Sequence, residues 1–177
     1  MSRLCCALVT AVLTVTLGGC AEQPQPAQQP AQQSRTTNLW RVVRVIDGDT
    51  IEVRRGNRFR TVRLIGIDTP ETVHPNEGVE CFGPEATRFT EEVLLGRRVT
   101  LEFDTSQGRR DLYGRTLAYV WIAAPHPRLF NLIAVRRGYA LEYTFDRAYL
   151  HRDDFVEAAS AAREARVGVW NCPTPGE

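Results

Sequence analysis

Residues 40–68, WRVVRVIDGDTIEVRRGNRFRTVRLIGID, contain three segments rich in β-branched residues, separated by two short polar connections. The segments cover residues 40–46, 50–54 and 59–67. The connections, Asp47-Gly48-Asp49 and Arg55-Gly56-Asn57, have the composition of tight turns. We therefore expect an antiparallel three-stranded meander. Because the first and third strands of a meander run in the same direction, Asp49 and Asp68 should lie close together at one end of the sheet.

The remainder of the 177 residues adds elements to this meander and leaves room for one domain with a sizeable core. Gly83-Pro84 opens an amphipathic segment, residues 85–95, which Gly96 ends, so a helix is expected there. Further strands are expected at residues 99–103 and 117–122, and further helices at 129–137 and 152–166. The pattern predicts an α+β fold, a five-stranded Greek-key β-barrel with three α-helices.

The first residues have the composition of an export signal. Arg3 precedes an apolar run, residues 4–17, that is too short to span a bilayer comfortably. The run ends in Leu17-Gly18-Gly19-Cys20, which resembles a bacterial lipoprotein cleavage site. Residues 1–19 are then a signal peptide, and Cys20 becomes a lipidated N-terminus. A plain signal peptide with an incidental cysteine is the alternative.

Residues 21–37, AEQPQPAQQPAQQSRTT, consist mainly of proline, glutamine and alanine. Such a segment cannot bury enough apolar surface to offset the entropy lost on ordering. We expect residues 20–38 to be a lipidated, disordered tether and residues 39–173 to be the folded domain. The protein is therefore expected to be exported and lipid-anchored to the bacterial cell envelope, or secreted.

Outside the signal and Cys20, two of the five cysteines remain, Cys81 and Cys172. In an exported domain two thiols favour one disulfide, and closing a loop of roughly 90 residues would stabilise the fold by about 4 kcal/mol. Two separate thiols are the alternative, because sequence does not give the distance between them.

The formal net charge of the chain is only +1, with 22 basic and 21 acidic residues, and every basic residue is arginine. This balance excludes capture of a polyanion through bulk charge, so a polyanion-binding protein of this composition must concentrate its basic groups locally. The planar guanidinium group suits phosphate, although genome composition also accounts for the arginine bias.

Three short stretches combine acids and guanidiniums in a way that packing alone does not require. They are Asp47-Gly48-Asp49-Thr50, then Arg63 with Asp68-Thr69-Pro70-Glu71, and Asp111-Leu112-Tyr113-Gly114-Arg115. Two neighbouring carboxylates, a carbonyl and waters suit Ca²⁺ better than a metal that prefers nitrogen or sulfur, and no Cys or His pair has zinc spacing. Taken alone, the first stretch also fits an ordinary hairpin turn.

The order and residues of these three motifs resemble those of the staphylococcal nuclease family, and the resemblance covers residues 40–170. It implies an OB-fold in which Asp49, Asp68 and the Thr69 carbonyl bind Ca²⁺. Asp47 would lie behind these ligands. It also implies catalytic roles for three further residues, Arg63, Glu71 and Arg115.

In the family, the residue that matches Glu71 is the general base that activates water, and the matching arginines stabilise the charge that grows on the phosphate. Each residue also has an ordinary interpretation. Glu71 could be a solvated loop acid and Arg115 a surface arginine. Strand alternation places Arg63 on the same face as Ile65 and Ile67, where a guanidinium requires an anion, either a carboxylate or a substrate phosphate.

Tyr113 and Tyr143 are candidates for stacking on bases, although packing within the protein is equally compatible with both. The segment around Tyr143 departs from the family pattern. His74, His126 and His151 are isolated, and we expect no catalytic role for them.

Together these features predict an exported, membrane-tethered, Ca²⁺-dependent endonuclease. The resemblance implies a monomer that cuts DNA and RNA with little sequence preference, favours single-stranded or unpaired regions and leaves 3′-phosphate ends. A catalytically silent OB-fold module that only binds nucleic acid is the first alternative. It is disfavoured because such a module has no use for a general base. An enzyme acting on a nucleotide or lipid headgroup is the second, disfavoured by the open polar loop at residues 72–83 and the lack of an evident apolar pocket.

Overall fold

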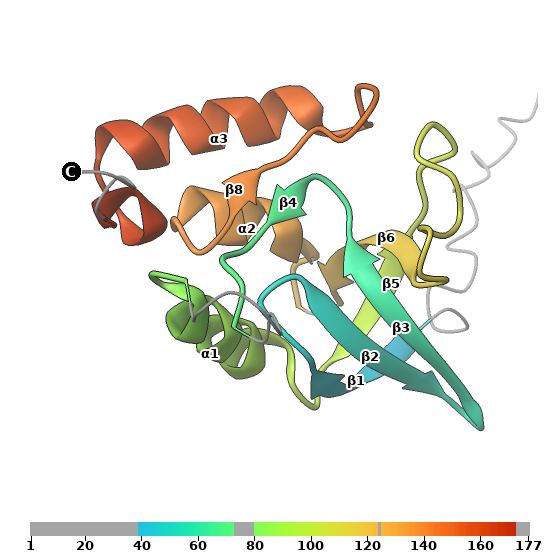
Figure 1. The fold of residues 1–177 in the computed structure, drawn as a ribbon. Helices are drawn as coiled ribbons and strands as arrows, with labels where there is room; N and C mark the ends of the chain where they lie inside the picture. The colour runs from blue at the N-terminus through green and yellow to red at the C-terminus, as the bar shows by residue number, and fades with distance from the viewer. Residues whose placement is uncertain (1–38, 73–79, 124, 173–177) are drawn as a thin grey trace, which may run out of the picture. The chain divides into compact units, whose positions relative to one another are not determined.

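The computed structural model describes residues 39–72, 80–123 and 125–172. Five strands form the barrel: β1 (Leu39–Val45), β2 (Thr50–Arg55), β3 (Arg58–Leu64), β5 (Arg98–Glu102) and β6 (Thr116–Ile122). Neighbouring strands pair in the order β3-β2-β1-β5-β6, and a parallel pairing between β3 and β6 closes the barrel (Figure 1). β7 (Arg128–Leu129) pairs antiparallel with the end of β6. The expected α+β barrel is confirmed.

The third strand of the meander is shorter than the sequence predicts, because a turn at Ile65-Gly66 interrupts it. Gly66 has a φ of 79°, and a Cβ there would lie 2.7 Å from the rings of Tyr149 and Phe155. After the turn, β4 (Ile67–Asp68) pairs with β8 (Leu141–Glu142) in a separate two-stranded sheet. The break redirects the chain just before Asp68.

In the described residues, the structure has the three expected α-helices and a short 3₁₀ helix. They are α1 (Gly83–Leu94), α2 (Phe130–Arg136), α3 (Arg152–Glu164) and η1 (Gly168–Asn171). α1 packs against β1, and α2 lies between β6 and α3 (Figure 1). No helix in the described ranges is both long enough and apolar enough to cross a bilayer.

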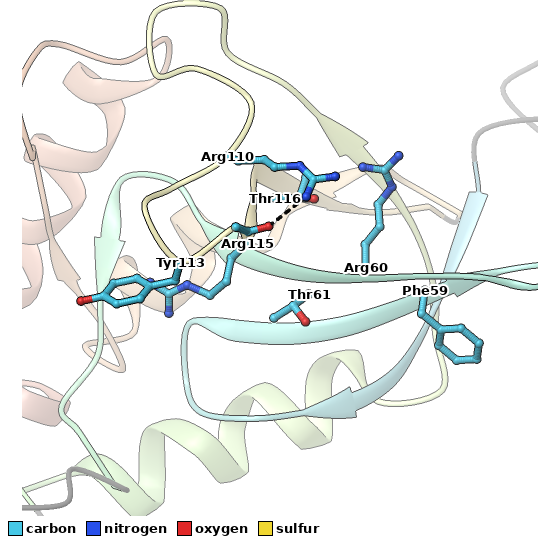
Figure 2. A pocket seen from close by; sticks show the side chains of 8 residues that line it. Phe59, Arg60, Thr61, Arg110, Tyr113, Arg115 and Thr116 are labelled. Carbon is cyan, nitrogen blue, oxygen red and sulfur yellow. Dashed lines mark hydrogen bonds between the residues drawn. The ribbon is translucent and has the colours of Figure 1, made fainter.

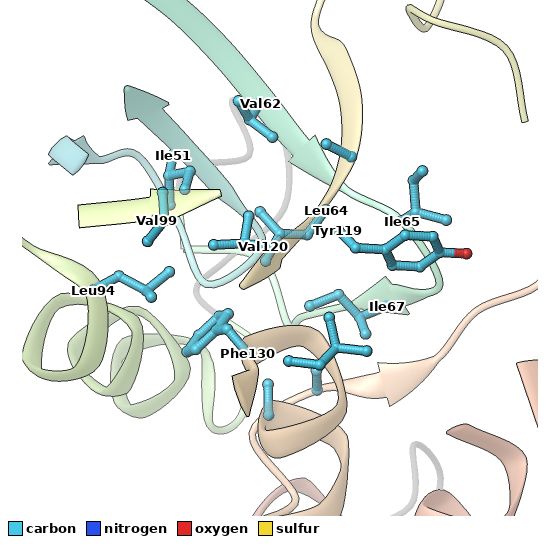
Figure 3. Packing of buried hydrophobic residues seen from close by; sticks show 14 of the residues in the cluster. Ile51, Val62, Leu64, Ile65, Ile67, Leu94, Val99, Tyr119, Val120 and Phe130 are labelled. Atoms are coloured by element: carbon cyan, nitrogen blue, oxygen red, sulfur yellow. The ribbon is translucent and has the colours of Figure 1, made fainter. Parts of the chain in front are cut away.

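The core fills the barrel and continues under the helices. Val42, Ile51, Val62 and Val99 are fully buried inside the barrel, and Phe130 from α2 lies against the barrel side chains (Figure 3). Alternation of buried and exposed positions along β1 and β2 gives the sheet its inner face. Complete burial of each of these side chains contributes about 2 kcal/mol.

One buried polar side chain, Asn131 at 0% exposure, connects α2 to the barrel. Its Oδ1 accepts a hydrogen bond from the Val120 N–H at 3.0 Å, and its Nδ2 donates to the Ile65 carbonyl at 2.9 Å. Because both partners are backbone groups, Asn131 fixes the turn after β3 relative to β6. This turn precedes Asp68 in the chain.

The Cys81–Cys172 disulfide, which the sequence favoured, is present, with a Cα–Cα distance of 6.0 Å. It joins the segment before α1 to the end of η1. The expected signal peptide, the lipidated Cys20, the tether and His74 lie outside the described residues.

We expect the Cys81→Ser/Cys172→Ser double variant to lose about 4 kcal/mol of unfolding free energy, because the bridge closes a loop of 91 residues in the unfolded chain. Urea unfolding of the two proteins measures the difference. A reducing agent should destabilise the wild type by a similar amount and leave the double variant unaffected. Identical unfolding curves with and without reductant would contradict the stabilising role.

Candidate active site

The turn between β1 and β2 presents Asp49 at the end of the barrel. Thr50 accepts hydrogen bonds through its carbonyl from the N–H groups of Ile46 and Asp47, at 2.9 and 3.3 Å. Asp47 Oδ1 accepts the Asp49 N–H at 3.1 Å. Asp47 therefore shapes the turn that carries Asp49, in the manner of an Asx turn.

Gly48 allows this turn to touch the segment after β4. A Cβ at Gly48 would lie 2.7 Å from Thr69 Oγ1, which is closer than side chains tolerate. The Gly48 carbonyl also accepts a hydrogen bond from Thr90 Oγ1 in α1, at 2.7 Å. The turn is thus held between Thr69 on one side and α1 on the other.

Asp49 is buried, with 5% of its surface exposed, and its two oxygens have different partners. Oδ1 accepts the Thr50 hydroxyl at 3.0 Å, and Oδ2 accepts the Thr69 N–H at 3.0 Å. The Asp49 carbonyl accepts the N–H of Leu64 at the end of β3, at 2.9 Å. The predicted proximity of the first turn and the end of the third strand is therefore observed.

Arg63 lies between the two candidate metal-binding carboxylates. Its Nη2 is 3.1 Å from Asp49 Oδ2 and 2.7 Å from Asp68 Oδ1, so both carboxylates contact one nitrogen and lie near each other. Its Nη1 donates to the carbonyls of Leu64 and Ile67, at 3.1 and 2.8 Å. Of the two partners that the sequence left open for Arg63, the structure shows the carboxylate.

The predicted orientation of Arg63 is wrong. Val62 and Leu64 are buried on the inner face of β3, and Arg63 alternates with them on the outer face. Ile65 lies in the turn that interrupts the strand, so the alternation that would have joined Arg63 to Ile65 and Ile67 does not extend that far. The outer position leaves 16% of the Arg63 side chain exposed.

The donors beside Arg63 fit a hard divalent cation. Asp49 and Asp68 supply carboxylate oxygens, and the Thr69 N–H bond to Asp49 places the Thr69 backbone next to them. Within the described ranges no cluster of three or more His, Cys, Asp or Glu side chains could hold a metal. A cation here would consequently take only two carboxylates from the described part of the protein and complete its coordination with carbonyl and water oxygens.

Asp111 organises the turn that carries Tyr113 and Arg115. Its Oδ1 accepts the N–H groups of both residues, at 3.0 and 2.8 Å, and its Oδ2 accepts Arg115 Nε at 2.5 Å. Sequence reasoning gave Asp111 no role of its own. The sequence does contain a signal for this role, because an Asp side chain commonly forms a turn by accepting the backbone N–H two residues later.

A cavity of about 520 Å³ is lined by both Arg63 and Arg115. Arg63 of β3 and Asp68 of β4 line it, together with Tyr113 and Arg115 from the segment before β6. Its apolar lining includes Ile67, Leu112, Leu117, Tyr143 and Phe145. The sequence had shown no apolar pocket, so that expectation is wrong: β8 brings Tyr143 to the cavity, where its N–H donates to the Gly66 carbonyl at 3.1 Å.

The aromatic and imidazole side chains separate into two groups. Tyr113 is 84% exposed and Tyr143 is 43% exposed, and both line the cavity. Exposed His126 lines no described cavity, and His151 pairs with Glu102 at 3.0 Å. The cavity therefore has aromatic faces available for contact with a ligand.

Glu71 is exposed and does not line this cavity. Its N–H donates to Glu80 Oε2 at 2.9 Å, and its carbonyl accepts the Glu80 N–H at 3.0 Å. These two bonds join the ends of the loop that contains residues 73–79. Glu80 precedes the disulfide residue Cys81, so the bridge holds the far end of this loop.

We expect metal affinity at this site to rise with pH up to about 7. Burial raises the pKa of Asp49 to about 7, against the opposing effect of Arg63, and burial also raises the pKa of Asp68. Because a metal binds the ionised carboxylate, a proton competes below that pKa, and the apparent affinity should fall by up to tenfold per pH unit. Calorimetric titration with Ca²⁺ at several pH values measures this dependence. Affinity that is constant below pH 7 would contradict the pKa assignment, and the Asp49→Asn variant controls for Ca²⁺ bound elsewhere.

Comparison with known proteins agrees with this geometry. A family described as Staphylococcal nuclease homologue matches residues 61–172. The chain is 33% identical over 164 residues to a protein named Thermonuclease from Staphylococcus hyicus, covering 93% of this chain and 94% of the relative. It is 40% identical over 129 residues to a Thermonuclease from Staphylococcus intermedius, covering 73% and 74%.

A third relative is an SPbeta prophage-derived endonuclease of Bacillus subtilis, 33% identical over 129 residues, which are 72% of this chain and 42% of that protein. The family match spans more than half of the chain, and the two thermonucleases match most of it. The barrel, the acid-bearing turn and the paired guanidiniums therefore have a common explanation: the chain belongs to the staphylococcal nuclease family.

Proposed function

We propose that the chain is a metal-dependent nuclease that hydrolyses phosphodiester bonds in DNA and RNA with little sequence preference. The observation that carries the proposal is the single cavity that Arg63, Asp68, Tyr113 and Arg115 line together. A phosphodiester is a compact anion with apolar and aromatic neighbours, and this cavity offers two guanidiniums and aromatic faces together. The names of the thermonuclease relatives support the same activity.

The two arginines would bind and orient the phosphate. Each is held by a carboxylate in the free protein, Arg63 by Asp49 and Asp68 and Arg115 by Asp111, so neither has to be ordered when substrate arrives. Their charges would offset the negative charge that grows on the phosphate oxygens in the transition state. The exposed faces of Tyr113 and Tyr143 would contact bases without selecting a sequence, which favours unpaired strands.

Family membership supports the general-base role proposed for Glu71, which lies outside the cavity lining and follows Asp68 by three residues. Its carboxylate would take a proton from water as the water oxygen forms a bond to phosphorus. The 5′ oxygen would leave with the electrons of the broken bond and take a proton from solvent water, so the products carry a 3′-phosphate and a 5′-hydroxyl. Asp49, Asp68 and the Thr69 carbonyl would hold Ca²⁺, which when bound supplies Lewis-acid stabilisation and neutralises the two carboxylates. Asp47 would support this set by shaping the turn.

We expect Glu71→Gln to lower the rate of single-stranded DNA cleavage by about 10²- to 10⁴-fold, because the amide cannot accept the proton of water. Single-turnover cleavage with saturating Ca²⁺ measures the rate, and a chelator should abolish it in the wild type. Glu91→Gln, which changes an exposed acid of α1, is the matched control. An unchanged rate in Glu71→Gln would remove the residue from the mechanism.

The same assay decides between the nuclease and its alternatives. A binding module would retain single-stranded DNA and leave it intact with every metal. An enzyme for nucleotides or lipid headgroups would hydrolyse those compounds faster than DNA or RNA in a panel at fixed Ca²⁺. Because the structure contains a cavity with an apolar lining, the expected lack of such a pocket no longer argues against this second alternative. The panel of substrates is therefore required.

The proposed site of action is based on the N-terminal sequence. We propose that the protein is exported, that residues 1–19 are removed and that Cys20 carries a lipid, so that the nuclease acts as a tethered monomer at the cell envelope. Support comes from the Leu17-Gly18-Gly19-Cys20 motif and the proline- and glutamine-rich segment behind it.

Fractionation of a bacterium that expresses the full chain tests the anchor. We expect the wild type in the membrane fraction, and Cys20→Ala, which cannot be lipidated, in the soluble exported fraction or retained with its signal uncleaved. Labelling with a radioactive fatty acid distinguishes a lipid anchor from an uncleaved signal. A wild-type protein that takes up no label would contradict the proposal.

A further inference from the structure

A second pocket, of about 200 Å³, opens beside the cavity already described. It lies where the edge of β3 becomes free: the parallel pairing with β6 begins at Val62, and Phe59, Arg60 and Thr61 precede it. Arg110, Gly114 and Thr116 form the opposite side. Figure 2 shows Arg60 and Arg110 reaching from β3 and from the loop before β6 toward the same space.

The pocket is strongly basic. Three arginines, Arg60, Arg110 and Arg115, line it together with two threonines, and no acidic side chain is among the lining residues. In the described part of the chain neither Arg60 nor Arg110 forms an ion pair; Arg60 packs over the Trp40 ring at 5.4 Å, and Arg110 donates to the Gly114 carbonyl at 3.4 Å. Two guanidiniums without a carboxylate partner make this pocket suitable for an anion.

The surrounding sequence reinforces that charge. Residues 53–67 contain five arginines and no acidic residue, although the whole chain has a net charge of only +1. The β2–β3 hairpin carries these five arginines and one acid, Glu52 of β2, which is the cross-strand partner of Thr61. The hairpin is therefore net positive, as a protein of balanced charge requires of the surface that holds a polyanion.

The second pocket adjoins the first. Arg110, Tyr113 and Arg115 line both, so a strand bound at the first cavity can pass over this segment into the second. Along the outer face of β3, Arg63 in the first cavity is followed by Thr61 and Phe59 in the second. Four residues of strand span about 13 Å, a distance that a short stretch of extended polynucleotide covers.

Phe59 adds an apolar surface at the far end of this path. Its side chain is 57% exposed on β3, although a buried position would be favoured for a ring of this size. The ring extends from the outer face of β3, on the opposite side of the strand from Arg60 (Figure 2). A base stacks on it where the bound nucleic acid crosses the edge of β3 from the arginines, which is contact that does not depend on base sequence.

We infer that the pocket formed by Phe59, Arg60 and Arg110 is an additional subsite for the nucleic-acid strand, binding a phosphate next to the cleaved linkage and stacking a base on Phe59. The inference rests on the proposed nuclease function, because a strand must first occupy the neighbouring cavity. It makes a polymer a better substrate than a dinucleotide, which is too short to reach both pockets.

Binding of fluorescent single-stranded DNA in the presence of a chelator tests the subsite without cleavage. We expect Arg60→Gln/Arg110→Gln to weaken binding roughly tenfold and to make the slope of log affinity against log salt shallower by about 1.4, for two lost phosphate contacts. Phe59→Ala should weaken binding roughly fivefold. That loss should be absent on a strand that lacks bases.

The matched control is Arg97→Gln/Arg128→Gln, which removes the same charge from two exposed arginines that line neither pocket. An equal loss in both double variants would reduce the effect to net charge and overturn the subsite, as would no loss in either. Melting temperatures verify folding of each variant, and Arg60→Lys/Arg110→Lys, which keeps both charges, should retain most of the salt slope. With the metal present, wild-type protein that binds DNA but does not cut it would refute the nuclease function and leave the binding result intact.

Discussion

The arrangement of the site depends on one guanidinium. Arg63 contacts both Asp49 and Asp68 through a single nitrogen and holds two carbonyls of the chain with the other. Without it, two half-buried or buried carboxylates would face each other, and desolvation already raises the pKa of each. The same contacts attach the turn after β1, the end of β3 and β4 to one another. Arg63 is therefore both the counter-charge of the acids and the fixed point of the cavity wall.

Much of the fold could be predicted, because periodicity and turn residues carry it. The meander, the helix after Gly83-Pro84, the strands β5 and β6 and the helices α2 and α3 all follow from alternation, caps and apolar stripes, and their ends differ from observation by a few residues. The short elements β4, β7, β8 and η1 were not predicted. The proximity of Asp49 to the end of β3 also followed, since the direction of the strands in a meander is fixed by its turns. These are local signals, or consequences of topology alone.

The parts that could not be predicted depend on contacts between distant residues. The break at Gly66 occurs because Tyr149 and Phe155, more than eighty positions later, occupy the space of a Cβ. That break removes Ile65 and Ile67 from the alternation on which the expected face of Arg63 was based, and it lets β8 bring Tyr143 to the cavity. Alternation cannot reveal a tertiary cause of this kind, and Asn131, which anchors the same turn, looks in sequence like any helical polar residue.

The arginines that line the two pockets differ in whether a carboxylate is bound to them. Arg63 and Arg115 are held by carboxylates, so a phosphate that approaches them meets oriented donors but must also meet nearby negative charge. Arg60 and Arg110 have no ion pair in the described residues and act as a uniformly positive surface. Arginines held by carboxylates orient the bound phosphate, and arginines without a carboxylate partner attract the nucleic acid from a distance. A chain with almost no net charge can therefore act on a polyanion, provided that both kinds lie along one path.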